Sequence, residues 1–177
     1  MGLFDLFRAK PAASQDEDYI VPNTIICQPV NRRARPRNNA RHGTQVLIID
    51  GHEVFAYELE KTLKTVKYQT LIAADAESGL EIARDERPKL IFLEVVLPGM
   101  HGFSALRKIR RDPELCDTPV ILMSASNKAA QHFYSNSIEA DDFMRKPFTR
   151  EEIFLRIDRL VDRSGVLRRI SPEQVKA

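Results

Sequence analysis

The segment KLIFLEVVLPGMHG, residues 89–102, combines a short apolar run with a turn. The run ends at a single acid, Glu94, and the pair Pro98 and Gly99 then predicts a tight turn. A short run rich in Ile and Leu that stops at a turn is typical of a buried strand. A carboxylate at the end of such a strand costs free energy unless it has a partner or a task. Glu94 is therefore the first candidate functional residue.

Strand-like and helix-like patterns alternate five times between residues 44 and 163. The predicted strands are 45–50, 70–74, 89–94, 119–125 and 141–145, and the predicted helices are 53–67, 76–86, 102–112, 127–138 and one that begins at residue 149. Asp75 is a predicted N-cap, and Thr149 with Glu152 predicts a capping box. The strands are apolar on both faces, which is typical of a parallel sheet covered by helices on both sides. The sequence therefore predicts an α/β fold with a doubly wound, five-stranded parallel sheet, a flavodoxin-like (βα)5 arrangement.

The composition is that of an ordinary globular protein. Of the 177 residues, 43% are hydrophobic and 29% are charged, and no apolar stretch is long enough to span a bilayer. The two cysteines, Cys27 and Cys116, have neither the spacing of a disulfide framework nor that of a zinc site. We therefore expect a cytoplasmic protein without stable membrane insertion.

Charge and proline content divide the chain into three parts. Residues 1–43 carry seven basic residues, four acidic residues and four prolines, and they predict a flexible, mostly irregular N-terminal extension with an arginine-rich segment. Residues 44–163 form the predicted domain. Residues 164–177 are expected to be a frayed C-terminal tail, too short for a DNA-binding or enzymatic output domain.

Polar residues stand where the predicted strands end. They are Asp50 after the first strand, Glu94 after the third, Ser124 after the fourth and Lys146 after the fifth. The carboxyl ends of parallel strands meet at one edge of the sheet, where the working groups of such folds gather. The sequence therefore predicts one crevice that contains two acids, a hydroxyl and an amine.

Four motifs resemble those of a known family. They are VLIID (46–50), LEVVLPGMHG (93–102), VILMSAS (120–126) and ADDFMRKPF (140–148). In this order and spacing they resemble a bacterial response-regulator receiver domain over residues 44–163. The resemblance implies the receiver fold and a role in two-component or chemotaxis-like signalling, through protein–protein interaction and not as an enzyme.

The resemblance also implies a chemistry for the strand ends. In the family, two acids after the first strand and an aspartate after the third hold Mg²⁺, and that aspartate becomes an acyl phosphate. A Ser or Thr and a Lys then bind the phosphoryl oxygens, which shifts an aromatic side chain and remodels the last helix–strand–helix face. Ser124, Lys146 and the switch aromatic Phe143 match these positions. We expect signalling partners to bind at the face around Phe143.

The chain departs from the family at the acidic positions. Gly51 stands in place of the second acid, Glu94 in place of the phosphorylated aspartate, and His101 in place of a loop aspartate. With Asp50 left as the metal-binding acid, we expect weak Mg²⁺ binding at best and no other cofactor. Glu94 is one methylene longer than aspartate, and a misplacement of about 1 Å can cost roughly 100-fold in rate. The resemblance thus predicts a degenerate pseudo-receiver that is not phosphorylated in the usual way.

Two interpretations of Glu94 remain open. In the first, its carboxylate pairs with Lys146 and fills space in a degenerate crevice. In the second, it directs its charge toward Ser124 and Lys146 and acts as a partial mimic of the phosphorylated state. The mimicry is incomplete because a carboxylate has one charge and lacks the three phosphoryl oxygens.

The arginine-rich segment suggests a second class of function. Its guanidinium groups suit phosphates and base stacking, and the candidate anion-binding residues are Arg32, Arg33, Arg35 and Arg37. The alternative function is therefore a ligand-binding adaptor in which this segment binds cyclic di-GMP or another polyanion. A solvated linker is the other interpretation of the same run. No helix-turn-helix is recognisable, so DNA binding is not expected.

Overall fold

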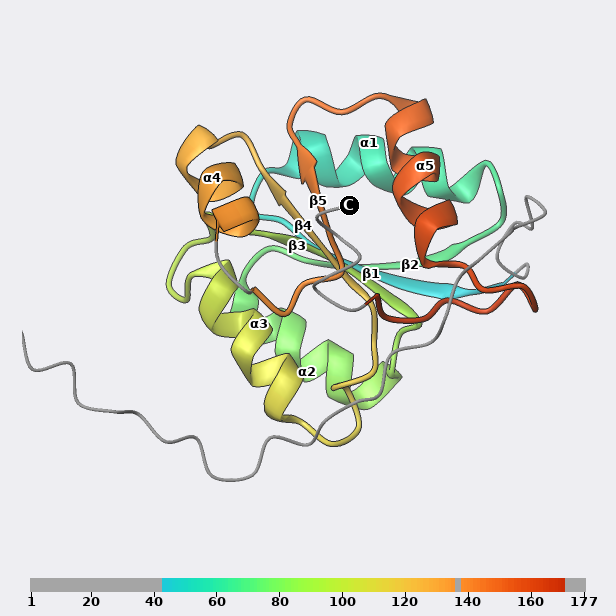
Figure 1. Cartoon of the computed structure of the whole chain (residues 1–177), viewed down its shortest axis with the longest axis horizontal. Coiled ribbons are helices and arrows are strands. Elements are labelled where there is room, and N and C mark those ends of the chain that lie inside the picture. Colours follow the sequence, from blue (N-terminus) through green and yellow to red (C-terminus); the bar gives the residue numbers. More distant parts are fainter. Residues whose placement is uncertain (1–42, 136–137, 171–177) are drawn as a thin grey trace, which may run out of the picture.

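The computed structural model of the chain describes residues 43–135 and 138–170 (Figure 1). Within these ranges, five strands form one sheet in the order β2-β1-β3-β4-β5, and every neighbouring pair is parallel. The strands are β1 (Gln45–Ile49), β2 (Gln69–Ala73), β3 (Leu90–Glu94), β4 (Val120–Ser124) and β5 (Asp142–Arg145). The predicted five-stranded parallel sheet is confirmed.

Helices follow the strands in alternation along the described chain. They are α1 (Glu53–Lys64), α2 (Ala76–Glu86), α3 (Gly102–Arg111), α4 (Asn127–Ser135) and α5 (Arg150–Leu160). Figure 1 shows α1 and α5 on one face of the sheet and α2 and α3 on the other. This arrangement confirms the predicted flavodoxin-like (βα)5 fold, with helices on both faces of the sheet.

The two helices with the clearest capping signals begin where the sequence predicts. The carboxylate of Asp75 accepts a hydrogen bond from Ser78 N–H at 2.8 Å, and this bond lowers the pKa of Asp75. The hydroxyl of Thr149 accepts one from Glu152 N–H at 3.2 Å at the start of α5. Each side chain satisfies a backbone N–H that has no partner within its own helix.

Two helices are shorter than the sequence predicts. α1 ends at Lys64, whereas the prediction continues to residue 67. Lys67 has a φ of 65°, in the left-handed region that a helix cannot continue through. α4 ends at Ser135, and Ile138, which the predicted helix includes, lies outside it.

The core explains why the strands coincide with the apolar runs. Every residue of β3 and β4 is buried, as are four of the five residues of β1. Gly79 allows α2 to approach β1 closely, because a Cβ at this position would lie 2.5 Å from Cδ1 of Ile49. The centre of the sheet is thus enclosed on both faces, whereas the edge strand β2 is partly exposed. The buried polar residues of the strands, Glu94, Ser124 and Asp142, lie at strand ends.

Residues 164–170, which the sequence predicts to fray, are folded against the domain. Val161 and Leu167 form an antiparallel bridge, and the chain then returns to the body of the domain. Ile170 is buried, with 5% of its surface exposed. The boundary expected at residue 163 therefore lies within folded structure.

Gly102 fixes the connection between β3 and α3. A Cβ at this position would collide with the carbonyl oxygen of Glu94 and lie 2.8 Å from Cα of Val95. The N–H of Gly102 donates to the carbonyl of Val95 at 2.9 Å, which closes the turn. The absence of a side chain at Gly102 therefore sets the position of the end of β3, and of Glu94 with it.

Gly102→Ala is expected to lower the free energy of unfolding by about 1–3 kcal/mol, the usual cost of overpacking. The direction is informative because alanine is otherwise the better helix former. Urea denaturation followed by circular dichroism measures the change. Ser104→Ala in the same helix is the control and should change the stability by less than about 0.5 kcal/mol. Equal stability of Gly102→Ala and the wild type would contradict the packing argument.

Candidate functional site

The four predicted strand-end residues lie at one edge of the sheet. Asp50 follows β1, Glu94 ends β3, Ser124 ends β4 and Lys146 follows β5. Because these strands are neighbours in the order β1-β3-β4-β5, their carboxyl ends adjoin. All four residues are buried. The polar groups therefore form an enclosed crevice and not an open surface patch.

Lys146 lies at the centre of this crevice. Its Nζ is 2.5 Å from Oδ2 of Asp50 and 2.5 Å from Oε2 of Glu94. The ring of Phe55, in α1, covers the same ammonium, with its centroid 4.7 Å from Nζ. Only 2% of the Lys146 side chain is exposed. Two carboxylates and an aromatic ring thus take the place of water around this charge.

The second oxygen of each carboxylate is held by the backbone. Oδ1 of Asp50 accepts a hydrogen bond from His52 N–H at 2.9 Å. Oε1 of Glu94 accepts one from Val96 N–H, also at 2.9 Å. Each acid therefore offers one oxygen to the backbone and the other to Lys146. The formal charge of the group is −1, from two carboxylates and one ammonium.

The hydroxyl of Ser124 is bonded outside this ionic group. Its Oγ accepts a hydrogen bond from Ser126 N–H at 3.2 Å. Its backbone carbonyl accepts one from Lys146 N–H at 3.0 Å, which continues the pairing of β4 with β5. The carboxylate of Glu94 contacts Lys146, whereas no side-chain hydrogen bond between Glu94 and Ser124 is present among the described residues.

The residues at this edge do not fit the Mg²⁺ ion that the resemblance implies. Gly51 supplies no oxygen where a second acid is expected, and a Cβ there would lie 3.2 Å from both Ala74 O and Pro98 Cδ. Magnesium requires several oxygen ligands in near-octahedral geometry, whereas Asp50 already binds the ammonium. Across the part of the chain that the structure describes, no group of three or more His, Cys, Asp or Glu side chains could hold a metal ion.

Phe143, the predicted switch aromatic, is buried in β5. Its ring stacks on Phe133 with centroids 5.4 Å apart and meets Tyr134 edge-on at 6.2 Å. Both partners belong to α4. Tyr134 is itself 49% exposed, and Leu155 in α5 is 60% exposed. The two helices that contact β5 thus present large apolar side chains to solvent.

Phe55 was not among the predicted site residues. It stands near the start of α1, shortly after Asp50 in the sequence. Its ring also packs near that of Phe148, with centroids 6.1 Å apart. The sequence does contain one signal for this role. Phe55 is an aromatic residue in the first helical turn after the strand-end acid Asp50, a position from which its ring can cover the crevice. The contact with Lys146 itself depends on the tertiary fold.

The predicted anion-binding residues Arg32, Arg33, Arg35 and Arg37 lie outside the described residues. Binding of cyclic di-GMP or another polyanion at this segment stays a prediction. Among the helices that the structure describes, none has the length and apolar character needed to cross a bilayer.

Known proteins are similar to this chain in sequence and in fold. The probable transcriptional regulatory protein TcrX of Mycobacterium tuberculosis is 34% identical over 122 residues, which is 68% of this chain and 51% of TcrX. Protein PilH of Pseudomonas aeruginosa is 28% identical over 114 residues, which is 64% of this chain and 94% of PilH. The receiver domain of the sensor histidine kinase PA1611 from the same organism, solved with a magnesium ion coordinated in its active site cleft, is 28% identical. It superposes with a TM-score of 0.59 over 66% of this chain and 95% of that domain.

The family match covers all five strands except the first residue of β1. Residues 46–158 match the response regulator receiver domain. The chain spans about half the length of TcrX and of several other curated relatives, such as the phosphate regulon regulator PhoB of Pseudomonas aeruginosa at 54%. The chain belongs to the response regulator receiver domain family, the signalling modules of two-component and chemotaxis-type systems.

Proposed function

We propose that the protein is an atypical receiver that signals in the cytoplasm by binding other proteins, and that Glu94 is not phosphorylated in the usual way. The observation that carries this proposal is the ammonium of Lys146, which lies 2.5 Å from an oxygen of Asp50 and 2.5 Å from an oxygen of Glu94. Its output is an interaction and not a catalysed reaction.

These contacts leave the crevice poorly prepared for phosphoryl transfer. Such a transfer requires an oxygen positioned in line and cations that neutralise the developing charge. Glu94 has one oxygen on Val96 N–H and the other on Lys146. Gly51 provides no ligand for a divalent cation. Because Phe55 also covers Lys146, a phosphodonor would have to displace packed groups to enter.

The same contacts support a crevice held in one state. In the family, the lysine binds a phosphoryl oxygen after phosphorylation, and here the carboxylate of Glu94 engages Lys146 without that event. Ser124 keeps its own bond to Ser126 N–H, so only one of the two phosphoryl-binding groups is engaged. We therefore propose that Glu94 is a partial, built-in substitute for the phosphoryl group.

The proposed binding surface is the face formed by α4, β5 and α5. Lys146 directly follows β5, and Phe143 within the same strand packs on α4. A short stretch of one strand therefore connects the charged crevice to this face. Tyr134 supplies an exposed aromatic side chain of the kind that anchors protein–protein contacts. Leu155 adds exposed apolar surface on the same face.

Acetyl phosphate with Mg²⁺ is expected to leave the wild-type chain unmodified, whereas the double variant Gly51→Asp/Glu94→Asp should gain a phosphoryl group. Gly51→Asp restores a carboxylate ligand for the metal ion, and Glu94→Asp shortens the nucleophilic side chain by one methylene. We therefore expect it to react at least about 100-fold faster than the wild type. Intact-protein mass spectrometry over time measures the addition.

The single variants Gly51→Asp and Glu94→Asp are the matched controls, because they separate the missing ligand from the misplaced nucleophile. A side chain at residue 51 requires shifts of a few tenths of an ångström around Ala74 and Pro98. The folding of each variant is therefore checked by thermal denaturation. Phosphoryl addition to the wild type at the rate of the double variant would refute the proposal.

Glu94→Gln is expected to weaken binding of the signalling partner by about tenfold, a typical coupling between a site and a remote surface. The amide keeps the size of the side chain but removes the charge that faces Lys146. The partner is first isolated from the native cytoplasm with the wild-type chain and identified by mass spectrometry. Calorimetric titration of the purified partner then gives the dissociation constants.

Glu58→Gln, which neutralises an exposed acid on α1, is the control for this experiment. Equal affinity of Glu94→Gln and the wild type would mean that Glu94 only fills the crevice. Tighter binding by Glu94→Gln would mean that Glu94 holds the chain in a non-binding state. Either result would contradict the proposal that Glu94 is a built-in substitute for the phosphoryl group.

A further inference from the structure

The chain beyond α5 forms a compact turn. Val161 and Leu167 bridge in antiparallel orientation across it. Oδ1 of Asp162 accepts hydrogen bonds from Ser164 N–H at 2.8 Å and from Val166 N–H at 3.0 Å. The hydroxyl of Ser164 also donates to this oxygen, and these bonds lower the pKa of Asp162. The turn reverses the chain so that it runs back toward the sheet.

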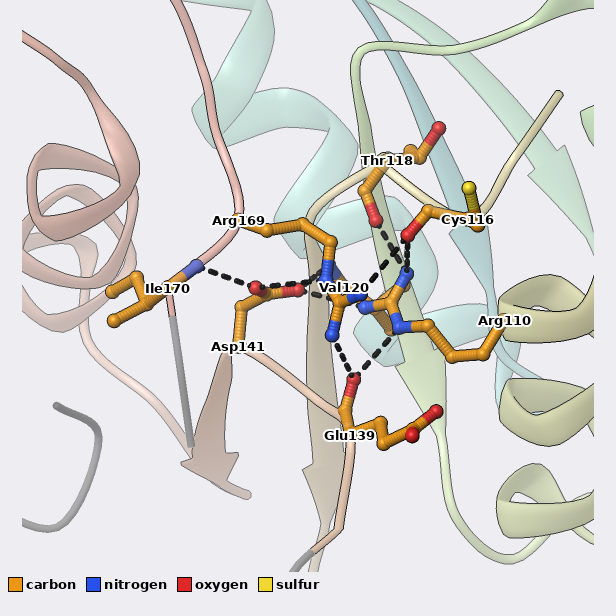
Figure 2. A network of polar contacts seen from close by, with 8 residues as sticks. All are labelled: Arg110, Cys116, Thr118, Val120, Glu139, Asp141, Arg169 and Ile170. Atoms are coloured by element: carbon orange, nitrogen blue, oxygen red, sulfur yellow. Dashed lines mark hydrogen bonds and ion pairs between the residues drawn. The ribbon is translucent and has the colours of Figure 1, made fainter. Parts of the chain in front are cut away.

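The end of this segment is anchored by a buried carboxylate. Figure 2 shows Arg169 and Ile170 directed at Asp141, with the backbone N–H of Ile170 2.7 Å from Oδ1 of Asp141. Arg169 donates to the carbonyl of Cys116 and to that of Glu139, each at 3.1 Å. Its Nε lies 3.4 Å from Oδ1 of Asp141. A segment with no recognisable pattern thus makes four polar contacts at one place.

The other side of this carboxylate is held by α3 and β4. Oδ2 of Asp141 lies 2.8 Å from Nη2 of Arg110 and accepts the backbone N–H of Val120 at 2.9 Å. Arg110 also donates to the carbonyls of Thr118 and Glu139, each at 2.7 Å. Burial raises the pKa of Asp141, and the guanidinium groups oppose that rise. Asp141 therefore joins the C-terminal segment to the body of the domain (Figure 2).

This cluster lies at the beginning of β5. Asp141 immediately precedes the strand, and its N–H donates to the carbonyl of Val120 at 2.9 Å. The same short strand contains Phe143 and is followed by Lys146. The C-terminal segment therefore contacts one end of the strand whose other end meets the charged crevice.

We infer that residues 161–170 are a C-terminal latch that opens as a unit and, when closed, holds the start of β5. When the latch opens, Oδ1 of Asp141 loses the N–H of Ile170 and the nearby Nε of Arg169. The carbonyls of Cys116 and Glu139 lose Arg169 but keep their bonds from Arg110. A buried polar atom that loses its partner raises the free energy of the surrounding structure. Opening therefore loosens β5, and a partner that binds the chain next to Ile170 acts on this strand.

The surroundings of the latch support a separate opening. It lies outside the region 46–158 that matches the family, and the sheet is complete without it. Its turn is largely exposed, at Arg163, Ser164, Val166 and Arg168. Segments with exposed turns and few buried side chains open at lower free energy than a core sheet. The latch is independent of the proposed role of Glu94, since its contacts involve neither the crevice nor a phosphoryl group.

Native-state hydrogen exchange of the full-length wild type in low urea tests whether the latch opens separately. The amides of Ile170 and Asp141 should exchange through an opening that depends little on urea, because it exposes little surface. The amides of β1 should exchange only through global unfolding, whose free energy falls steeply with urea concentration. Identical urea dependence for Ile170 and β1 would overturn the proposal.

Arg169→Ala in the full-length chain tests the contacts. It should speed exchange at Ile170 and Asp141 by about tenfold or more, as expected for the loss of charged hydrogen bonds, and leave β1 unchanged. Arg169→Lys keeps the positive charge, but a single ammonium cannot donate to both carbonyls as the planar guanidinium does. It should therefore also speed exchange at Ile170 and Asp141, but less than Arg169→Ala does. Arg111→Ala is the matched control, because Arg111 is exposed on α3 and has no ion pair among the described residues.

The urea series of the wild type and the exchange rates of the Arg169 variants together test the proposal. Faster exchange in Arg169→Ala at Ile170 and β5, without a change in β1, supports the latch. Unchanged exchange at Ile170, or acceleration at Ile170 without any at Asp141 and β5, means that the segment does not hold the strand and overturns the proposal. The wild-type urea series remains decisive if Arg169→Ala does not fold.

Discussion

The buried ammonium of Lys146 is the contact on which the carboxyl edge of the sheet depends. It binds Asp50 and Glu94, which mark the ends of β1 and β3, and it follows β5 itself. One cation thus joins the ends of three strands. Without this ammonium, two buried carboxylates would face each other without a counter-ion. The free-energy cost of that arrangement is far greater than the net stability that the ion pairs contribute. Its three charged side chains are bound to one another, with a net formal charge of −1, whereas a phospho-accepting crevice must keep its ligands available.

A second buried ionic group fixes the opposite edge. Asp141 there is bound by guanidinium groups from α3 and from the chain after α5. β5 begins at this group and ends at Lys146, so the strand is held at both ends by charge. Buried ion pairs add little net stability, but they penalise any arrangement that separates the partners. The consequence for β5 is a defined position between two fixed points, with Phe143 between them.

Local patterns in the sequence were sufficient for most of the fold. The apolar runs indicated the strands, because β1, β3 and β4 are buried on both faces. Asp75 and Thr149 marked helix starts, because their side chains cap backbone N–H groups. The strand-end residues of the crevice could be identified because each follows such a run. Contacts between distant segments could not be derived this way. The cover of Phe55 over Lys146 and the pairing of Arg169 with Asp141 exist only once the chain has folded, and residues 164–170 have no periodicity to indicate structure.

The position of Ile170 also determines where this domain can be cut or joined to another protein. The family match ends at residue 158 and α5 ends at Leu160. A fragment that stops at either point would lack Arg169 and Ile170 and would open the buried carboxylate of Asp141 to solvent. A fusion junction placed after Ile170 retains both residues and their contacts with Asp141. For this receiver, folded structure therefore continues beyond the end of the family match, at least to Ile170.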